Sequence, residues 1–151
     1  MALTDDIRLL SQLPLFHGMS EEQLRLIAFG ADRRHIAAGQ TLFREKSPAE
    51  CAYVVARGSF ELSAVDGAGA SKVEATVQTG TLLSELALVT LVERKYTAVA
   101  LEDSDVIRIT RALFHRLIEE YPDAGQLIEN RVRANFAAMA RQAAAMLHRF
   151  S

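Results

Sequence analysis

The sequence predicts an α+β fold that is mainly β: an eight-stranded antiparallel β roll, or jelly roll, flanked by N-terminal helices and followed by a short helix and a long C-terminal helix. Between Arg33 and Ile109 the apolar residues recur with a period of about two, in short segments separated by turn residues. On either side of that region the period is helical. We expect residues 1–151 to form one domain, with helices in residues 1–32, the β roll in 33–110 and further helices in 111–151.

The N-terminal region carries signals for two helices. Thr4 is expected to cap the first, which ends at Pro14. Ser20 and Gln23 fit a capping box that opens the second, and Gly30 fits its C-terminal stop. The apolar residues expected to pack on the core between the two helices are Leu13, Leu15 and Phe16.

Seven β-prone segments follow, and turn signals separate them. The segments are residues 35–37, 41–44, 52–56, 59–64, 73–78, 96–101 and 106–109. The turn signals are residues 38–40, 46–48, 57–58, 66–69 and 103–104. Asp66-Gly67 is a typical hairpin turn, and the even spacing of the segments favours a sandwich, jelly roll or barrel.

Two helices are expected after the β region. Thr110 is a candidate cap for a short helix that ends near Tyr121, and Asp123 for a long helix that runs to about Phe150 and measures about 40 Å. The apolar stripe of the long helix has heptad-like spacing and consists of Ile128, Val132, Phe136, Met139, Ala143, Met146 and Phe150. Since a helix of this length overhangs a small β domain, we expect part of the stripe to form a homodimer with a second chain. The alternative is a helix folded back along its own domain.

The composition excludes some classes of protein and weighs against others. The 17 basic and 19 acidic residues leave no positive excess of the kind that a dedicated nucleic-acid binder shows. Cys51 is the only cysteine, which excludes an internal disulfide and a cluster held by four thiolates. No apolar run approaches the roughly 18 residues of a transmembrane helix, and the N-terminus lacks a signal-peptide pattern. We therefore expect a cytoplasmic protein without a membrane partner.

An enzyme is not expected. The chain has no nucleophile elbow and no Walker loop. A metal-dependent enzyme of the cupin type would need clustered ligands, whereas the four histidines are scattered: His17, His35, His115 and His148. A haem sensor is a further alternative, with Cys51 or His35 as the axial ligand, although a lone cysteine in a strand is more often a small core residue.

Residues 80–98 contain the candidate site. Glu85 opens a short apolar turn that begins after Gly80, and Arg94 follows it. Neither charged side chain is readily buried without a partner. From the residues alone, two interpretations stay open. The pair serves a ligand that carries hydroxyls and a phosphate, or it is a buried Glu85–Arg94 ion pair that only fixes a loop.

Several motifs occur in order along residues 9–147. Leu13-Pro14-Leu15-Phe16 and segment 20–24 precede a hairpin segment at 38–45 and a strand segment at 53–58. Gly80 follows, and then Ser84-Glu85-Leu86-Ala87-Leu88, Arg94 and Thr97-Ala98. In this order the motifs resemble the cyclic nucleotide-binding domain family, which includes the regulatory domain of the bacterial catabolite activator protein and the kinase regulatory subunit. The last of them resembles the family's phosphate-binding cassette.

The resemblance implies a non-enzymatic sensor that binds a cyclic mononucleotide, cAMP or cGMP, without a cofactor or metal. In the family the arginine, here Arg94, binds the phosphate together with N–H groups of the turn, and the glutamate, here Glu85, accepts a hydrogen bond from the ribose 2′-hydroxyl. Binding would shift the two C-terminal helices and so generate the signal. The implied ligand-binding residues are Leu83, Ser84, Glu85, Leu86, Ala87, Arg94, Lys95, Tyr96 and Met139.

Three features depart from the family's pattern. The family usually has glycine before the glutamate, where this chain has Ser84, and small residues after the arginine, where it has Lys95 and Tyr96. At the base-contacting position, Met139 can cover a purine by packing but cannot select adenine over guanine by hydrogen bonding. The alternative function is therefore a degenerate member that no longer binds nucleotide and acts as a dimeric interaction scaffold.

The expected output is a contact with a protein rather than with DNA. Transcription factors of the family continue past the long helix into a helix-turn-helix domain, whereas this chain stops at Ser151. The arginines of the long helix do not form a dense basic face; they are Arg131, Arg133, Arg141 and Arg149. We expect no nucleic-acid partner and a protein partner that the sequence does not identify. The alternative is that the chain is a fragment of a longer regulator.

Overall fold

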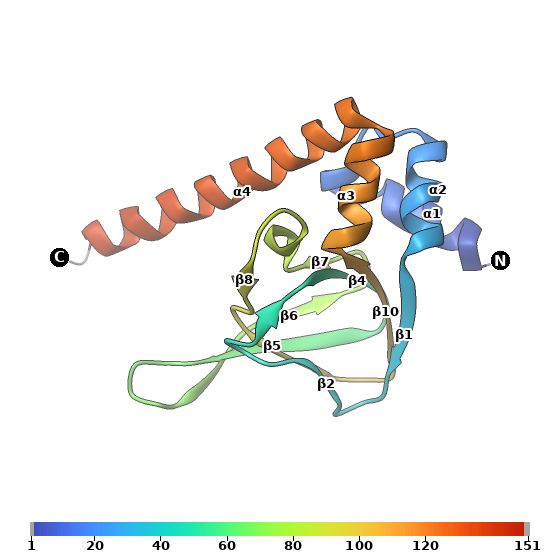
Figure 1. Ribbon diagram of the computed structural model, residues 1–151. Helices are drawn as coiled ribbons and strands as arrows, with labels where there is room; N and C mark the ends of the chain where they lie inside the picture. The colour runs from blue at the N-terminus through green and yellow to red at the C-terminus, as the bar shows by residue number, and fades with distance from the viewer. Residues whose placement is uncertain (1, 150–151) are drawn as a thin grey trace.

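A β roll forms the body of the molecule, α1, α2 and α3 pack together at one end of it, and α4 crosses above it (Figure 1). The computed structural model describes the backbone of residues 2–149 and the side chains of residues 3–142. The helices are α1 (Ala2–Ser11), α2 (Glu21–Gly30), α3 (Arg111–Glu120) and α4 (Pro122–Arg149), with the 3-10 helices η1 (Pro14–Phe16) and η2 (Glu85–Leu88). The predicted fold class, α+β and mainly β, is confirmed.

The described residues form ten strands, and all of their pairings are antiparallel. They are β1 (Asp32–Ile36), β2 (Thr41–Phe43), β3 (Pro48–Ala49), β4 (Cys51–Arg57), β5 (Ser59–Val65), β6 (Ser71–Gln78), β7 (Leu82–Leu83), β8 (Val92–Glu93), β9 (Thr97–Ala100) and β10 (Ser104–Thr110). One sheet has the order β1-β10-β4-β7, the second has the order β2-β9-β5-β6, and β3 pairs with β8. Each of the seven predicted segments overlaps a strand. Strands β3, β7 and β8 were not predicted, because two residues cannot show an alternation.

Strand β4 separates two hydrophobic cores. Ala52 and Val54 face the helices, where η1 contributes Phe16, while Tyr53 and Val55 face the interior of the roll. Successive side chains of a strand point to opposite faces of the sheet, so one strand can supply both cores. Because both faces are covered, the sequence of β4 is an almost uninterrupted apolar run rather than an alternating one.

Two of the predicted helix caps are confirmed. The Ser20 side chain accepts a hydrogen bond from the N–H of Gln23, whose side chain accepts one from the N–H of Ser20, which completes the capping box of α2. The hydroxyl of Thr110 accepts a hydrogen bond from the N–H of Leu113 and caps α3. Each cap satisfies a backbone donor that has no partner within the helix.

Two predicted N-terminal caps, Thr4 and Asp123, were wrong, and Gly30 ends α2 for a reason other than the predicted one. Helix α1 begins at Ala2, so Thr4 lies within it. Helix α4 begins at Pro122, so Asp123 lies in its first turn and is not its cap, and the missing N–H of Pro122 suits the first helical position. Gly30 is the last residue of α2 and does not adopt a positive φ. A Cβ there would lie 2.4 Å from a methyl group of Leu113, so a larger residue would require the Leu113 side chain to move.

Helix α4 is anchored to its own domain by its N-terminal half. Ile128 and Val132 are fully buried, and the guanidinium of Arg131 donates to the carbonyl oxygens of Leu15 and His17 at 3.0 and 2.7 Å. The first part of the apolar stripe therefore packs within the chain, and α4 then extends past the roll (Figure 1). The stripe residues Ala143, Met146 and Phe150 lie outside the described side chains. Among the described residues, no helix is both long and apolar enough to cross a membrane.

Gly58 forms the tight turn between β4 and β5. Its φ is +91°, and a Cβ at this position would lie 2.1 Å from the hydroxyl oxygen of Ser104 and 2.8 Å from its Cα. Ser104 is fully buried, and its hydroxyl oxygen accepts from the N–H of Ser59 at 3.2 Å and donates to the carbonyl of Glu102 at 2.8 Å. The turn and β10 thus fit together only without a side chain at residue 58.

We expect Gly58→Ala to lower the free energy of unfolding by roughly 2–4 kcal/mol, because it adds overpacking to the cost of a positive φ. Gly39→Ala is the matched control, since Gly39 has a φ of +85° with open space around its Cβ position. This variant should lose only about 1 kcal/mol. Urea denaturation followed by circular dichroism measures both, and equal losses would contradict the packing argument.

Candidate functional site

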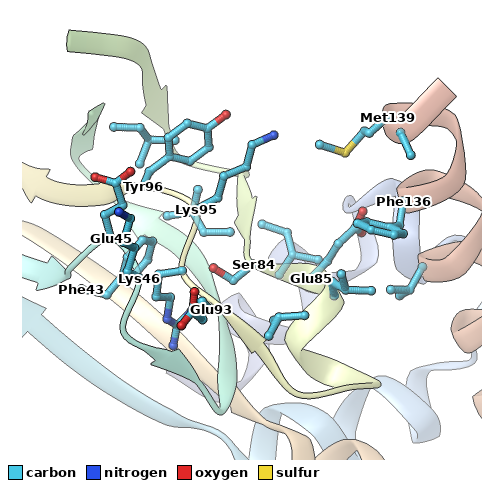
Figure 2. A pocket seen from close by; sticks show the side chains of 18 residues that line it. Phe43, Glu45, Lys46, Ser84, Glu85, Glu93, Lys95, Tyr96, Phe136 and Met139 are labelled. Carbon is cyan, nitrogen blue, oxygen red and sulfur yellow. The ribbon is translucent and has the colours of Figure 1, made fainter. Parts of the chain in front are cut away.

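A cavity of about 760 Å³ lies between the roll and α4 (Figure 2). This volume is in the range of small-molecule sites. The roll contributes the side where Phe43, Glu45 and Lys46 lie, and α4 contributes Phe136 and Met139 on the other side. The full lining is Phe43, Glu45, Lys46, Leu62, Leu82, Leu83, Ser84, Glu85, Leu86, Val92, Glu93, Arg94, Lys95, Tyr96, Val132, Phe136, Met139 and Ala140.

The cavity brings together eight of the nine residues predicted for ligand binding: Leu83, Ser84, Glu85, Leu86, Arg94, Lys95, Tyr96 and Met139. Ala87 is the exception and is fully buried. Its N–H donates to the carbonyl of Ser84 at 3.0 Å, and its carbonyl accepts from Arg111 at 2.8 Å. Both backbone groups of Ala87 therefore hold the turn together beneath the cavity wall, and a direct ligand contact by this residue stays a prediction.

The turn at Ser84 positions the start of η2. Strand β7 pairs with β4 through Leu83 and Tyr53, and Ser84 then adopts φ 64° and ψ 41°. This left-handed conformation costs a residue with a Cβ about 1 kcal/mol relative to glycine. Serine thus occupies the conformation for which glycine is the usual choice. The first N–H groups of the following 3-10 helix, those of Glu85 and Leu86, have no acceptor within that helix.

Arg94 places a cation at the edge of the cavity while being 6% exposed. Its guanidinium donates to the carbonyl oxygen of Cys51 at 2.9 Å and to Cys51 Sγ at 3.3 Å. The same group lies 4.6 Å from the ring centroid of Phe43 and 5.3 Å from that of Tyr53. Cation–π contacts and two hydrogen bonds therefore replace the water that this charge has lost.

The hypothesis of a Glu85–Arg94 ion pair is wrong for this structure, in which the described ion pairs include neither residue. Glu85 instead accepts a hydrogen bond from the side-chain amide of Asn135 on α4 at 3.3 Å. Burial raises the pKa of the Glu85 carboxyl, and the hydrogen bond from Asn135 offsets part of that rise. The carboxylate of Glu85 and the guanidinium of Arg94 are thus held by different partners.

Val132, Asn135 and Phe136 are residues of α4 at the site that the sequence did not predict as site residues. All three belong to the helix face that starts at Val132 and continues to Met139, with the spacing of three and four residues that defines one face. Val132 and Phe136 were assigned to the dimer stripe only, and Asn135 was not assigned at all. The periodicity contained this signal, but it did not show that the face covers a cavity.

Lys95 and Tyr96 leave the cavity open. Tyr96 packs against the core of the roll, and the ammonium nitrogen of Lys95 lies 5.6 Å from the centroid of its ring. Figure 2 shows both side chains on the roll side of the cavity, facing the α4 residue Met139 across it. The large ring after Arg94 therefore narrows one side of the cavity without filling it.

Six charged side chains and an apolar wall define what the cavity can hold. Lys46, Arg94 and Lys95 are cationic, and no described ion pair includes any of them. The carboxylates are Glu45, Glu85 and Glu93, and the α4 wall consists of Val132, Phe136, Met139 and Ala140. The arrangement suits a small molecule with an anionic group, hydroxyls and an apolar part.

The candidate haem ligands are not brought together. Cys51 is buried beside Arg94, whereas His35 lies on the exposed face of β1 with Nδ1 3.0 Å from a carboxylate oxygen of Asp105. The contact with His35, followed by that with Arg57, lowers the pKa of Asp105. In the part of the chain that the structure describes, no group of three or more His, Cys, Asp or Glu side chains could hold a metal ion.

Solved structures and curated proteins provide three close comparisons. A cyclic nucleotide-binding-like protein from Brucella abortus is 42% identical, with a TM-score of 0.70 over 76% of this chain and 98% of that one. The cyclic AMP receptor protein of Thermus thermophilus is 29% identical over 86% of this chain and 58% of its own length. The crystal structure of the catabolite activator protein from that organism gives a TM-score of 0.77 over 89% of this chain and 62% of that one.

An uncharacterized NTE family protein of Mycobacterium tuberculosis is 30% identical over 92% of this chain, which spans only 22% of the length of that relative. The family model described as "Cyclic nucleotide-binding domain" matches residues 33–121, which contain the β roll, the turn at Ser84 and Arg94. With its β roll, its flanking helices and the cavity that they enclose, the chain belongs to the cyclic nucleotide-binding domain family.

Proposed function

We propose that the protein is a non-enzymatic regulatory module that binds a cyclic mononucleotide, cAMP or cGMP, in the cavity beneath α4. The observation that carries the proposal is the convergence of Arg94, Glu85 and the turn at Ser84 on one open cavity. Membership of the family and the likeness to a cyclic AMP receptor protein support the choice of ligand. On this proposal residues 1–151 act as one unit, in the cytoplasm and without a cofactor or metal.

Each part of the nucleotide has a suitable partner. The guanidinium of Arg94 has five N–H donors, of which two are used by Cys51, and on this proposal the others serve the cyclic phosphate. Glu85 accepts a hydrogen bond from the ribose hydroxyl through a carboxylate whose other contact is Asn135. The base packs against Phe136 and Met139. Since the α4 wall is apolar, it does not choose between adenine and guanine, and both nucleotides remain candidates.

Removing the guanidinium should abolish nucleotide binding. We expect Arg94→Ala to weaken the affinity for cAMP and cGMP at least about a hundredfold, measured by isothermal titration calorimetry, because the phosphate loses its charged donors. Arg116→Ala is the control, since Arg116 is exposed on α3 outside the cavity and should bind like the wild type. Circular dichroism of Arg94→Ala checks that the variant folds.

The alternative function is a degenerate member that binds no nucleotide and acts as a dimeric scaffold. The observation that favours it is the apolar face of α4, on which the Phe136 and Met139 side chains are 52% and 51% exposed. Absence of heat from wild-type protein with millimolar cAMP, cGMP or cyclic dinucleotides would contradict the sensor and favour the scaffold.

The proposed role of Glu85 predicts opposite effects on stability and affinity. Its raised pKa means that the ionised carboxylate is less favourable in the folded state than in the unfolded state, so this group destabilises the fold at neutral pH. Glu85→Gln should therefore unfold at a higher temperature than the wild type at pH 7 and bind nucleotide more weakly. The stability difference develops as the pH rises from the ordinary glutamate value, about 4.3, through the raised folded value, and it is absent at lower pH.

Thermal melts of wild type and Glu85→Gln between pH 3 and pH 8, on the order of one melt per pH unit, measure this difference. Glu119→Gln provides the control, because Glu119 is exposed on α3 and away from the cavity. A stability gain that stays constant down to the lowest pH would show that the charge of Glu85 is not its cause.

The proposed signal is a change in the position of α4. The helix contacts the site through the hydrogen bond from Asn135 to Glu85 and through its apolar wall, while Arg131 anchors it to η1 and the residues after it. A ligand that binds Glu85 and the wall alters the contacts of the outer half of α4 and leaves the anchor in place. The downstream partner is proposed to be a protein and not a nucleic acid.

We further propose a homodimer through the outer half of α4, because Phe136 and Met139 continue a stripe whose first residues are already buried. Wild-type protein should sediment as a dimer at micromolar concentration, and Met139→Lys should shift it to the monomer. Ala134→Lys places the same charge on the opposite face of the helix and should stay dimeric. A monomeric wild type, or dissociation of both variants alike, would contradict this interface.

A further inference from the structure

Two residues other than glycine have a positive φ in the described chain, and both line the cavity: Lys46 at 70° and Ser84 at 64°. A residue with a Cβ loses about 1 kcal/mol in this conformation, and such strain concentrates at functional sites. The other positive-φ positions are all glycines: Gly18, Gly39, Gly58, Gly69 and Gly80. None of these five glycines lines the cavity, whereas the two positions that line it retain a side chain.

The backbone of Lys46 is tied to that of Arg94. The N–H of Lys46 donates to the carbonyl of Arg94 at 2.7 Å, and the N–H of Arg94 donates to the carbonyl of Ser47 at 2.8 Å. Ser47 in turn bonds to the carbonyl of Arg44 through both its N–H, at 3.2 Å, and its hydroxyl, at 2.6 Å. Strands β3 and β8 continue this pairing. The loop is therefore fixed on both sides, and it holds the α-carbon of Lys46 in place beside that of Arg94.

The charges around Lys46 leave its ammonium available. No described ion pair includes Lys46, and the neighbouring Glu45 accepts a hydrogen bond from the N–H of Val65 at 3.0 Å. Figure 2 places Lys46 with Phe43 on the roll side of the cavity, opposite the apolar residues of α4. Phe43 is also the ring over which the guanidinium of Arg94 lies. Lys46 and Arg94 therefore border the same polar side of the cavity, together with Lys95 and the carboxylates Glu45 and Glu93.

We propose that Lys46 is a second anion-binding residue of this cavity, and that its ammonium contacts the phosphate of the bound nucleotide together with Arg94. The inference rests on the proposed function and adds a residue to its site. It also accounts for a lysine at a position where glycine would be less strained. Because the ammonium sits on a flexible stem, it reaches the phosphate without a change in the loop.

Calorimetric titration of cAMP and cGMP into lysine variants tests the proposal. Lys46→Met removes the charge, keeps the length of the side chain and keeps the strain, and should weaken binding about tenfold to a hundredfold. Lys46→Arg should bind within about threefold of the wild type, because a cation is retained. Lys72→Met is the matched control on β6, outside the cavity, and should bind like the wild type.

Lys46→Gly separates the strain from the charge. It should bind as weakly as Lys46→Met and yet unfold at a higher denaturant concentration than Lys46→Met, since glycine relieves the positive φ. In addition, the affinity of Lys46→Met should fall less steeply with ionic strength than that of the wild type.

The outcomes distinguish this inference from the proposed function. Tight binding by the wild type with unchanged affinity in Lys46→Met would overturn the role of Lys46 and leave the sensor function standing. Loss of binding in Lys72→Met to the same extent would also overturn it, because a general effect of charge would then be sufficient. A wild type that binds neither nucleotide would overturn both.

Discussion

The burial of the Arg94 guanidinium is the constraint on which the site depends. A charge that is 6% exposed has to be compensated, and here the carbonyl and thiol of Cys51 and the rings of Phe43 and Tyr53 provide the compensation. These partners come from β2 and β4, which belong to different sheets. The cation thus fixes the two sheets relative to each other at the point where the cavity opens. No described ion pair includes Arg94, so no carboxylate of the described residues neutralises its charge.

The same arrangement explains why Glu85 and Arg94 do not neutralise each other. Glu85 is oriented by α4 through Asn135, whereas Arg94 is oriented by the roll. Two opposite charges held by different elements can act on different groups of one ligand, because no ion pair between them has to be broken before binding. Glu85 contacts α4 through Asn135 and also lines the cavity, so this one carboxylate connects the position of α4 with the occupancy of the cavity.

The sequence predicted the architecture well because the decisive patterns are local. The capping box of Ser20 and Gln23, the cap at Thr110 and the apolar run of β4 each follow from residues close in the chain. The candidate site was predicted through the order of motifs, which placed eight of nine residues on one cavity. What could not be predicted are contacts between distant segments, such as the bonds from Arg94 to Cys51 and from Asn135 to Glu85. The side of a helix that covers a cavity is likewise set by tertiary packing.

The anchoring of α4 through its N-terminal half has a mechanical consequence. Beyond Val132, which is the last fully buried residue among the described side chains, the helix continues to Arg149, a length of about 25 Å at 1.5 Å per residue. A tilt of roughly 10° about the anchor near Val132 would displace the far end by about 4 Å, somewhat less than the rise of about 5.4 Å of one helical turn. Any tilt at the anchor is therefore amplified along α4, so a sub-ångström shift beside Glu85 corresponds to a displacement of several ångströms at the far end of the helix.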